Sequence, residues 1–120
     1  MDKKALIREY KEARRPMGVY CIRNTVNGKL LIGKSIDLPA ILNRQRAQLR
    51  SGSHPNPALQ TDLVGYGAEA FEVEVLDTLE VPDQADYDPS ADLLTLEQMW
   101  LDKLSPFGTR GYNPEPKRAV

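Results

Sequence analysis

The sequence predicts one small α/β (α+β) domain in which a three-stranded antiparallel sheet is flanked by helices. Three segments carry β-branched and aromatic residues in alternating patterns, and they lie at residues 17–25, 29–34 and 70–79. An Asn-Gly pair joins the first two segments, and the stretches between and after the strands repeat apolar residues at helical spacing. A chain of 120 residues is typical of a single domain.

The N-terminal half of the chain predicts a helix followed by a β-hairpin. Residues 2–14 read as an amphipathic helix, GVYCIRNT at 18–25 as the first strand, and LLIG at 30–33 as the returning strand. We expect a type I′ turn at Asn27 and Gly28, because that turn needs a positive φ at both central residues and Asn-Gly supplies it most readily.

Three helices are predicted in the remainder of the chain. Asp37 is the expected N-cap of one that runs to about Ser51 and ends at Gly52. A shorter helix covers about residues 57–66, and the third strand follows it. After an acidic loop that contains proline, the last helix is expected over about residues 92–104.

The segment GKLLIGKS at residues 28–35 matches the pattern G-x-x-x-x-G-K-[ST] of a phosphate-binding P-loop. A P-loop is a flexible turn between a strand and a helix, whose backbone N–H groups surround phosphates. Here Leu30, Leu31 and Ile32 form an apolar run between the glycines, and Gly28 already belongs to the predicted turn. The segment is therefore a strand, and the sequence excludes a nucleotide triphosphatase.

Charge is distributed unevenly along the chain. Residues 1–50 carry twelve Lys and Arg against four Asp and Glu, whereas residues 51–120 carry four against thirteen. This favours an anionic ligand on the first half, although mutual neutralisation of the halves explains it equally well.

The sequence has no run of about 18 apolar residues, which excludes a membrane span. The single Cys21 offers neither a disulfide framework nor a zinc site, so we expect a cytoplasmic location.

An ordered series of motifs resembles the GIY-YIG nuclease superfamily, in particular its intron-encoded and phage-type members. The series covers residues 18–113 and consists of GVY, NTVNGKLLIGKSIDL, LRSGSHPNPALQTDLVGYGAEAFEVEVL, EQMWLDKL and GYN. The resemblance implies a small three-stranded antiparallel sheet with helices around it, which agrees with the elements predicted above. It also implies an endonuclease that cleaves phosphodiesters with one divalent metal ion such as Mg²⁺.

The resemblance assigns family roles to four positions of this sequence. Tyr20 stands at the GIY tyrosine, which lies beside the attacking water or acts as the base. Glu97 stands at the glutamate that holds the metal, His54 lies in the G-x-H loop of phage-type members, and Asn113 closes the GYN turn. Without the family, a packed strand tyrosine, a solvated glutamate and an ordinary loop histidine are the simpler interpretations. Glu97 lies on the apolar stripe of its helix, however, where a carboxylate needs a partner or a metal.

Three other family positions are replaced. Leu31 stands at the YIG tyrosine, Ile41 at the arginine that clamps the phosphate, and Gln45 at a histidine four residues later. Two of these changes make a polar site apolar, and we predict that cleavage is impaired. Arg44 lies about 60° from Ile41 around the helix and is a candidate substitute for the missing arginine.

The first half of the chain also carries candidate nucleic-acid-binding residues. Basic side chains on the hairpin and the following helix can track a phosphate backbone, and the simpler alternative is a solvated helix face. The residues predicted to contact nucleic acid are Arg23, Lys34, Arg44, Arg46 and Arg50.

The sequence therefore predicts an N-terminal helical extension at residues 1–16, a GIY-YIG-like domain at 17–113 and a tail at 114–120. The leading function is a nucleic-acid-binding module, for DNA or another nucleic acid, with impaired cleavage and weak Mg²⁺ binding at Glu97. The alternatives are an active Mg²⁺-dependent endonuclease and a protein-interaction domain with no nucleic-acid role. Active relatives often carry a separate DNA-targeting domain, so we expect targeting to come from another protein.

Overall fold

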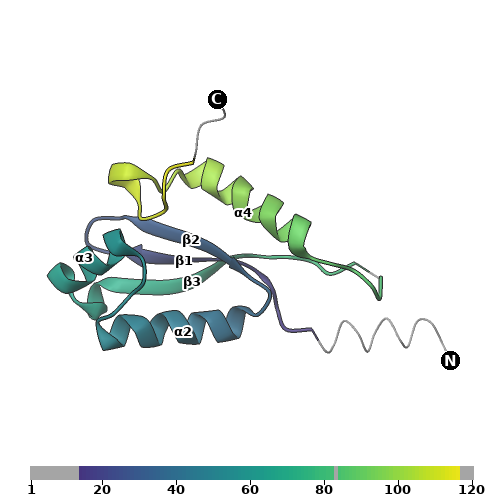
Figure 1. Cartoon of the computed structure of the whole chain (residues 1–120), viewed down its shortest axis with the longest axis horizontal. Coiled ribbons are helices and arrows are strands. Elements are labelled where there is room, and N and C mark those ends of the chain that lie inside the picture. Colours follow the sequence, from purple (N-terminus) through teal and green to yellow (C-terminus); the bar gives the residue numbers. More distant parts are fainter. Residues whose placement is uncertain (1–13, 83, 117–120) are drawn as a thin grey trace.

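The computed structural model describes residues 14–82 and 84–116 and confirms the predicted architecture. The helix predicted over residues 2–14 lies, up to residue 13, outside the described residues. The elements are labelled in Figure 1 and have the bounds β1 Gly18–Asn24, β2 Leu30–Ser35, α2 Leu38–Ser51, α3 Pro57–Tyr66, β3 Phe71–Thr78 and α4 Ser90–Leu104, with single 3₁₀ turns at Ala68–Ala70 and Gly108–Arg110. Within the described ranges, no helix has the length and apolar composition needed to cross a bilayer.

The sheet is antiparallel, with the strand order β2-β1-β3. The register pairs Tyr20 of β1 with Gly33 of β2, and the pairing of β1 with β3 shifts by one residue between Val19 and Tyr20. Helices α2 and α4 lie on opposite faces of this sheet, with α2 over β1 and β3 and α4 over β1 and β2 (Figure 1). The central strand is therefore covered on both sides.

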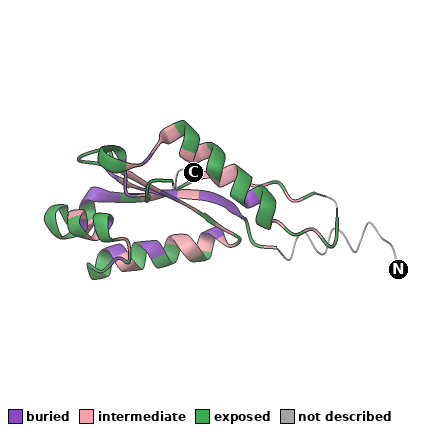
Figure 2. Cartoon of the chain, turned by 45° about the horizontal axis from the view of Figure 1, so that its top comes forward, coloured by how far each residue is buried: buried purple, intermediate pink, exposed green. Residues whose placement is uncertain are grey.

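Alternate residues of β1 supply two separate hydrophobic cores. Ile22 packs on the α2 side with Leu49, Leu59 and other side chains, including the ring of Tyr112. Val19 and Cys21 pack on the other side, where α4 contributes its apolar residues Leu96, Trp100, Leu101 and Leu104. Figure 2 shows this central strand as the most continuously buried part of the chain. A strand buried on both faces explains why GVYCI, the first five residues of β1, has no polar side chain at alternate positions except the tyrosine hydroxyl.

The hairpin turn differs from the type I′ turn that we predicted. Gly28 has a φ of 78°, but Asn27 does not have a positive φ, because Ser105 is the one non-glycine residue with positive φ among those described. Instead, residues 25–29 form a longer loop in which the N–H of Gly28 donates to the carbonyl of Asn24. The Asn24 side chain accepts bonds from two loop N–H groups, at 3.0 and 3.4 Å. The buried asparagine thus organises the loop, and a single positive φ is enough.

Capping residues set the ends of the helices largely as predicted. Asp37 accepts the N–H of Ala40 at 3.1 Å at the start of α2, and Gly52 ends that helix with a φ of 77°. Helix α4 begins at Ser90, two residues earlier than predicted. The side chain of Asp88 accepts both the N–H and the hydroxyl of Ser90, which satisfies groups at this helix end and explains the earlier start.

Candidate functional site

Tyr20 lies at the centre of the candidate site. Its half-buried side chain extends over Gly33, and a Cβ built on that glycine would lie 2.5 Å from the tyrosine hydroxyl. Burial raises the pKa of Tyr20, the nearby charge of Glu97 raises it further, and the charge of Arg44 lowers it. The tyrosine is therefore close to one acidic group on α4 and one basic group on α2.

Glu97 occupies the inner part of α4 and is largely shielded from solvent. Its side chain is 17% exposed, and its Oε1 lies 3.4 Å from the Nζ of Lys34 on β2. The predicted metal ligand thus already has a cationic partner. Trp100, one turn later on α4, donates its indole N–H to Asp77 at 3.0 Å and fixes the helix against β3.

His54 is buried and bound at both ring nitrogens. Its Nε2 lies 2.6 Å from Gln45 Oε1, and its Nδ1 accepts the N–H of Asn56 at 3.1 Å. These partners define the neutral tautomer with the proton on Nε2, since an amide oxygen accepts and an N–H donates. Burial lowers the pKa of His54, which also favours the neutral ring. The arrangement holds the G-x-H loop against α2 through Gln45, one of the replaced family positions.

The other two positions at which we expect a family residue to be replaced carry apolar side chains. Leu31 on β2 packs against the hydrophobic core on the α2 side, and Ile41 on α2 is half-buried. Neither side chain offers a hydrogen-bond donor to a phosphate. Arg44 is exposed and acts on Tyr20 electrostatically, so it is the described basic residue of α2 that faces this site.

The predicted nucleic-acid-binding residues do not form one surface. Arg23 pairs with Glu72 at 2.9 Å and with Glu74 at 3.3 Å. Arg46 and Arg50 line a hollow between α2 and β3, away from Tyr20. Lys34 contacts Glu97, and the charge of Arg44 acts on Tyr20, so these two are the predicted residues linked to the candidate site.

The side chains around Glu97 do not fit a resident divalent cation. Within residues 14–82 and 84–116, no three His, Cys, Asp or Glu side chains lie close enough together to hold a metal ion. A magnesium site built on one carboxylate takes its other ligands from water and substrate. At Glu97, however, the ammonium of Lys34 contacts the carboxylate, and it would repel a second cation.

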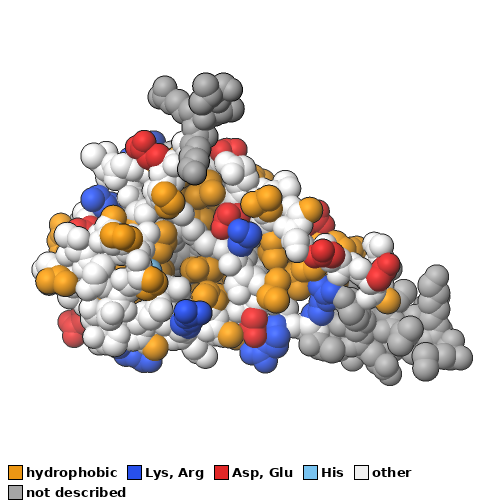
Figure 3. Space-filling model, viewed as in Figure 1, with side chains coloured by type: hydrophobic (Ala, Val, Ile, Leu, Met, Phe, Trp, Pro, Cys, Tyr) orange, Lys and Arg blue, Asp and Glu red, His pale blue; other side chains and the backbone are white. Residues whose placement is uncertain are grey.

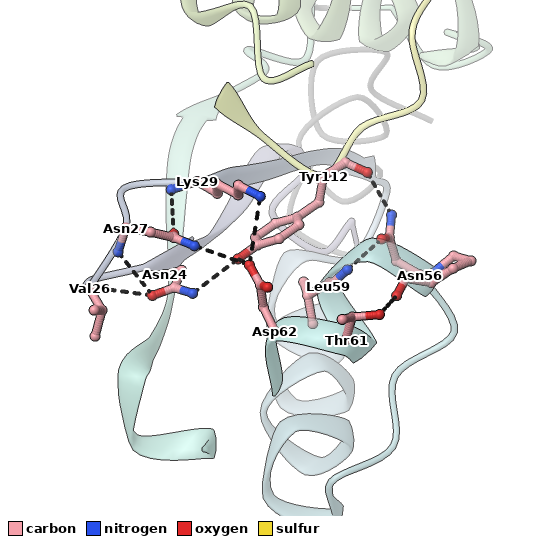
Figure 4. Close-up of polar contacts among 10 residues, drawn as sticks. Asn24, Val26, Asn27, Lys29, Asn56, Leu59, Thr61, Asp62 and Tyr112 are labelled. Atoms are coloured by element: carbon pink, nitrogen blue, oxygen red, sulfur yellow. Dashed lines mark hydrogen bonds and ion pairs between the residues drawn. The ribbon is translucent and has the colours of Figure 1, made fainter. Parts of the chain in front are cut away.

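A buried polar cluster around Tyr112 was not predicted (Figure 4). The Tyr112 hydroxyl donates to Asp62 at 2.7 Å and accepts from Asn24 at 3.1 Å, while its backbone carbonyl accepts from Asn56 at 2.9 Å. Burial is the main cause that raises the pKa of Tyr112 to about 12, and the hydrogen bond to Asp62 is the second. The cluster joins the hairpin loop, α3 and the C-terminal segment. Its signal in the sequence was an asparagine, Asn24, at the end of an apolar strand, and the structure buries that residue fully.

The face of the molecule seen in Figure 3 separates residue types. Hydrophobic side chains are visible in its middle, between α4 and α2, and Lys and Arg lie mainly toward α2. Asp and Glu gather near the beginning of α4. A polyanion that approaches this face would meet the α2 side more favourably than the start of α4.

Comparisons with known proteins support the fold. No protein-family model matches the sequence. Intron-associated endonuclease 1 of Enterobacteria phage T4 is 29% identical over 96 residues, which are 80% of this chain and 36% of that protein. The chain therefore spans little more than a third of the length of this curated relative.

Two solved structures share the fold. The catalytic domain of the homing endonuclease I-TevI superposes with a TM-score of 0.65 and 28% identity, over 83% of this chain and 99% of that domain. A mutant of the I-TevI catalytic domain gives a TM-score of 0.64 and 24% identity, over 82% and 92%. Together with the sheet of order β2-β1-β3, these similarities show that the chain is a homologue of the I-TevI catalytic domain.

Proposed function

We propose that this nuclease-type domain binds nucleic acid and that its phosphodiester cleavage is impaired. The observation that carries the proposal is the state of the three replaced positions. Leu31 packs into the core, Ile41 supplies no charge, and Gln45 holds His54 as a neutral buried ring. The charges of Glu97 and Arg44 still act on Tyr20, and this supports a charged surface around a site without the usual phosphate clamp.

The expected loss of rate follows from where charge develops in the reaction. Removing one preorganised donor from a developing oxyanion costs on the order of 10²–10³ in rate. Here a guanidinium and a tyrosine hydroxyl are both replaced by aliphatic groups. Apolar walls also disfavour a charged transition state, so impairment of at least this size is expected.

A second candidate function is an active endonuclease in which Arg44 is the phosphate clamp. The effect of Arg44 on the pKa of Tyr20 favours it, because it brings a guanidinium near the tyrosine from the same helix that carries the family arginine. In this alternative Arg44 would stabilise the phosphoryl charge, and Tyr20 would orient the attacking water. The two candidates differ in activity and not in the ligand.

The deciding experiment combines a binding assay with a nicking assay on supercoiled DNA. For the impaired module we expect salt-sensitive binding of the wild-type chain and little or no nicking in Mg²⁺ or Mn²⁺. The informative gain-of-function variant is Leu31→Tyr, Ile41→Arg and Gln45→His together, since groups that act as a unit are not additive. Nicking by the wild type that is lost in both Arg44→Ala and Glu97→Ala would instead establish the active endonuclease. If the wild-type chain does not bind DNA even at low salt, the remaining hypothesis is a protein-interaction domain with no nucleic-acid role.

The proposal extends to targeting and location. We propose that a separate protein supplies sequence specificity, and that both act in the cytoplasm, where the free, buried thiol of Cys21 is stable. Co-purification of a DNA-sequence-specific partner with the tagged chain tests this part.

A further inference from the structure

The contact between Lys34 and Glu97 joins the edge of the sheet to α4. Lys34 lies on β2, paired with Val19 of β1, and its side chain is 40% exposed. Glu97 is more deeply placed, and its Oε1 lies 3.4 Å from the lysine Nζ. A shielded carboxylate needs a compensating positive charge, and the lysine provides it from within the chain.

This contact conflicts with the metal role that the family resemblance gives to Glu97. A divalent cation on the same oxygen would sit next to the lysine ammonium, and the two like charges would repel each other strongly at such a short separation. The conflict rests on the position of Lys34 and not on any missing ion. A lysine ammonium is also a compact donor of three hydrogen bonds, well suited to a phosphate oxygen.

We propose that the ammonium of Lys34 takes the place of the divalent cation on Glu97, so that a nucleic-acid phosphate is bound without metal between Lys34 and Arg44. The inference deepens the proposed function and rests on it for the identity of the ligand. Glu97 orients Lys34, and Arg44, whose charge acts on Tyr20, provides the second positive charge. The anion would be held by two fixed cations of the chain, as in other phosphate sites formed by Lys and Arg.

The metal half of the proposal is tested with Mn²⁺ alone, followed by electron paramagnetic resonance of the free ion. We expect the wild type to bind Mn²⁺ weakly and Lys34→Ala to bind it about tenfold more tightly or better, because one close like charge is removed. Adding Glu97→Gln to Lys34→Ala should abolish the gain. Lys34→Met, which keeps the apolar stem, should behave as Lys34→Ala does.

The matched control is Lys103→Ala. Lys103 lies on the same helix as Glu97, but its ammonium is over the ring of Trp100, at 4.9 Å. The change in net charge is the same, so an equal gain in Mn²⁺ affinity in this control would overturn the proposal. Tight Mn²⁺ binding by the wild type that depends on Glu97 would overturn it as well.

The phosphate half is tested with a short duplex DNA at constant ionic strength. We expect the wild type to bind equally well in EDTA and in Mn²⁺. Lys34→Ala should bind several-fold more weakly in EDTA, and Mn²⁺ should restore its affinity, because the ion then replaces the ammonium. Failure of Mn²⁺ to restore binding would overturn the phosphate half. Absence of DNA binding by the wild type would instead overturn the proposed function, and the Mn²⁺ titration would still decide the role of Lys34.

Discussion

At the scale of single residues, Gly33, the second glycine of GKLLIGKS, makes room for the side chain of Tyr20. The Tyr20 hydroxyl lies 2.5 Å from the place that a Cβ on Gly33 would take, and the first glycine, Gly28, supplies the positive φ of the hairpin loop. The apparent P-loop pattern therefore has two unrelated structural causes. One glycine allows a turn, and the other makes room for an aromatic side chain across the strand pair.

A first prediction follows for Gly33→Ala. The added methyl group forces the Tyr20 ring to move, and we expect a loss of about 1–3 kcal/mol in the free energy of unfolding, as for other overpacked sites. Urea denaturation measures it. Gly65→Ala is the matched control, because a Cβ there meets no atom within 4 Å and the residue lies in α3. The control should be neutral or slightly more stable. An equal loss in both variants would contradict the steric explanation.

A second prediction concerns His54 and pH. Because burial lowers the pKa of His54, the unfolded chain takes up a proton below about pH 6.5 that the folded chain does not. The free energy of unfolding should therefore be insensitive to this group above pH 6.5 and should fall as pH decreases below it, by at most about 1.4 kcal/mol per pH unit. His54 is the only histidine in the chain.

Urea titrations between pH 5 and pH 7.5 test this prediction. The variant His54→Asn should be less stable near neutrality, because Gln45 loses its partner, but its stability should depend less on pH in this window. An unchanged pH dependence in the variant would show that other groups, such as the carboxylates, cause the slope.

At the scale of elements, the C-terminal segment completes the outer edge of β2. Asn113 accepts the N–H of Ile32 at 2.8 Å and donates to its carbonyl at 2.9 Å, so one side chain imitates the pairing of a neighbouring strand. The N–H of Tyr112 also donates to the carbonyl of Leu30. The GYN turn thus covers a strand edge next to the candidate site.

A third prediction follows for Asn113→Ala. Two backbone groups of Ile32 lose their partner, and we expect a loss of about 1–3 kcal/mol in stability together with faster hydrogen exchange of the Ile32 amide. Asn43→Ala, an exposed position on α2, is the control and should change neither quantity appreciably. Normal protection of the Ile32 amide in Asn113→Ala would mean that the side chain does not support the edge.

The elements themselves were largely predictable from local chemistry. Asp37 and Gly52 define α2 through hydrogen bonding and backbone conformation, and alternation identified the strands. The hairpin loop was predicted wrongly, because the Asn-Gly rule considers only the turn residues. The side chain of Asn24, which is bound to Tyr112, reorganises the loop from outside that window.

At the scale of the whole molecule, the basic half of the sequence divides into separate surfaces. Arg44 faces the site, while Arg50 lies on the other side of α2 beside β3. We predict that Arg44→Ala weakens DNA binding and lowers the slope of log affinity against log salt by about one, as expected for one lost phosphate contact. Arg50→Ala, the matched control, should have a smaller effect. Fluorescence anisotropy across a salt series gives both quantities, and equal effects would place the contact surface on the whole of α2.

The composition of the site was only partly predictable. Spacing and resemblance named Tyr20 and Glu97 and drew attention to Gln45. They did not reveal that Lys34 binds Glu97 or that Gln45 binds His54, because each pair joins residues from different elements. For the same reason, the prediction that Arg23 contacts nucleic acid did not include its ion pairs. Its carboxylate partners lie on β3, about fifty residues away along the chain.

The central position of β1 also affects how the chain is made and folded. Its partner β2 follows after a short loop, so the hairpin can form as soon as residue 35 has emerged from the ribosome. The other edge of β1 has to wait for β3, which ends at Thr78, and closing so long a segment is slow. During that interval an apolar strand edge is open to other chains. Growing polypeptides of this protein should therefore depend on a chaperone until β3 is complete.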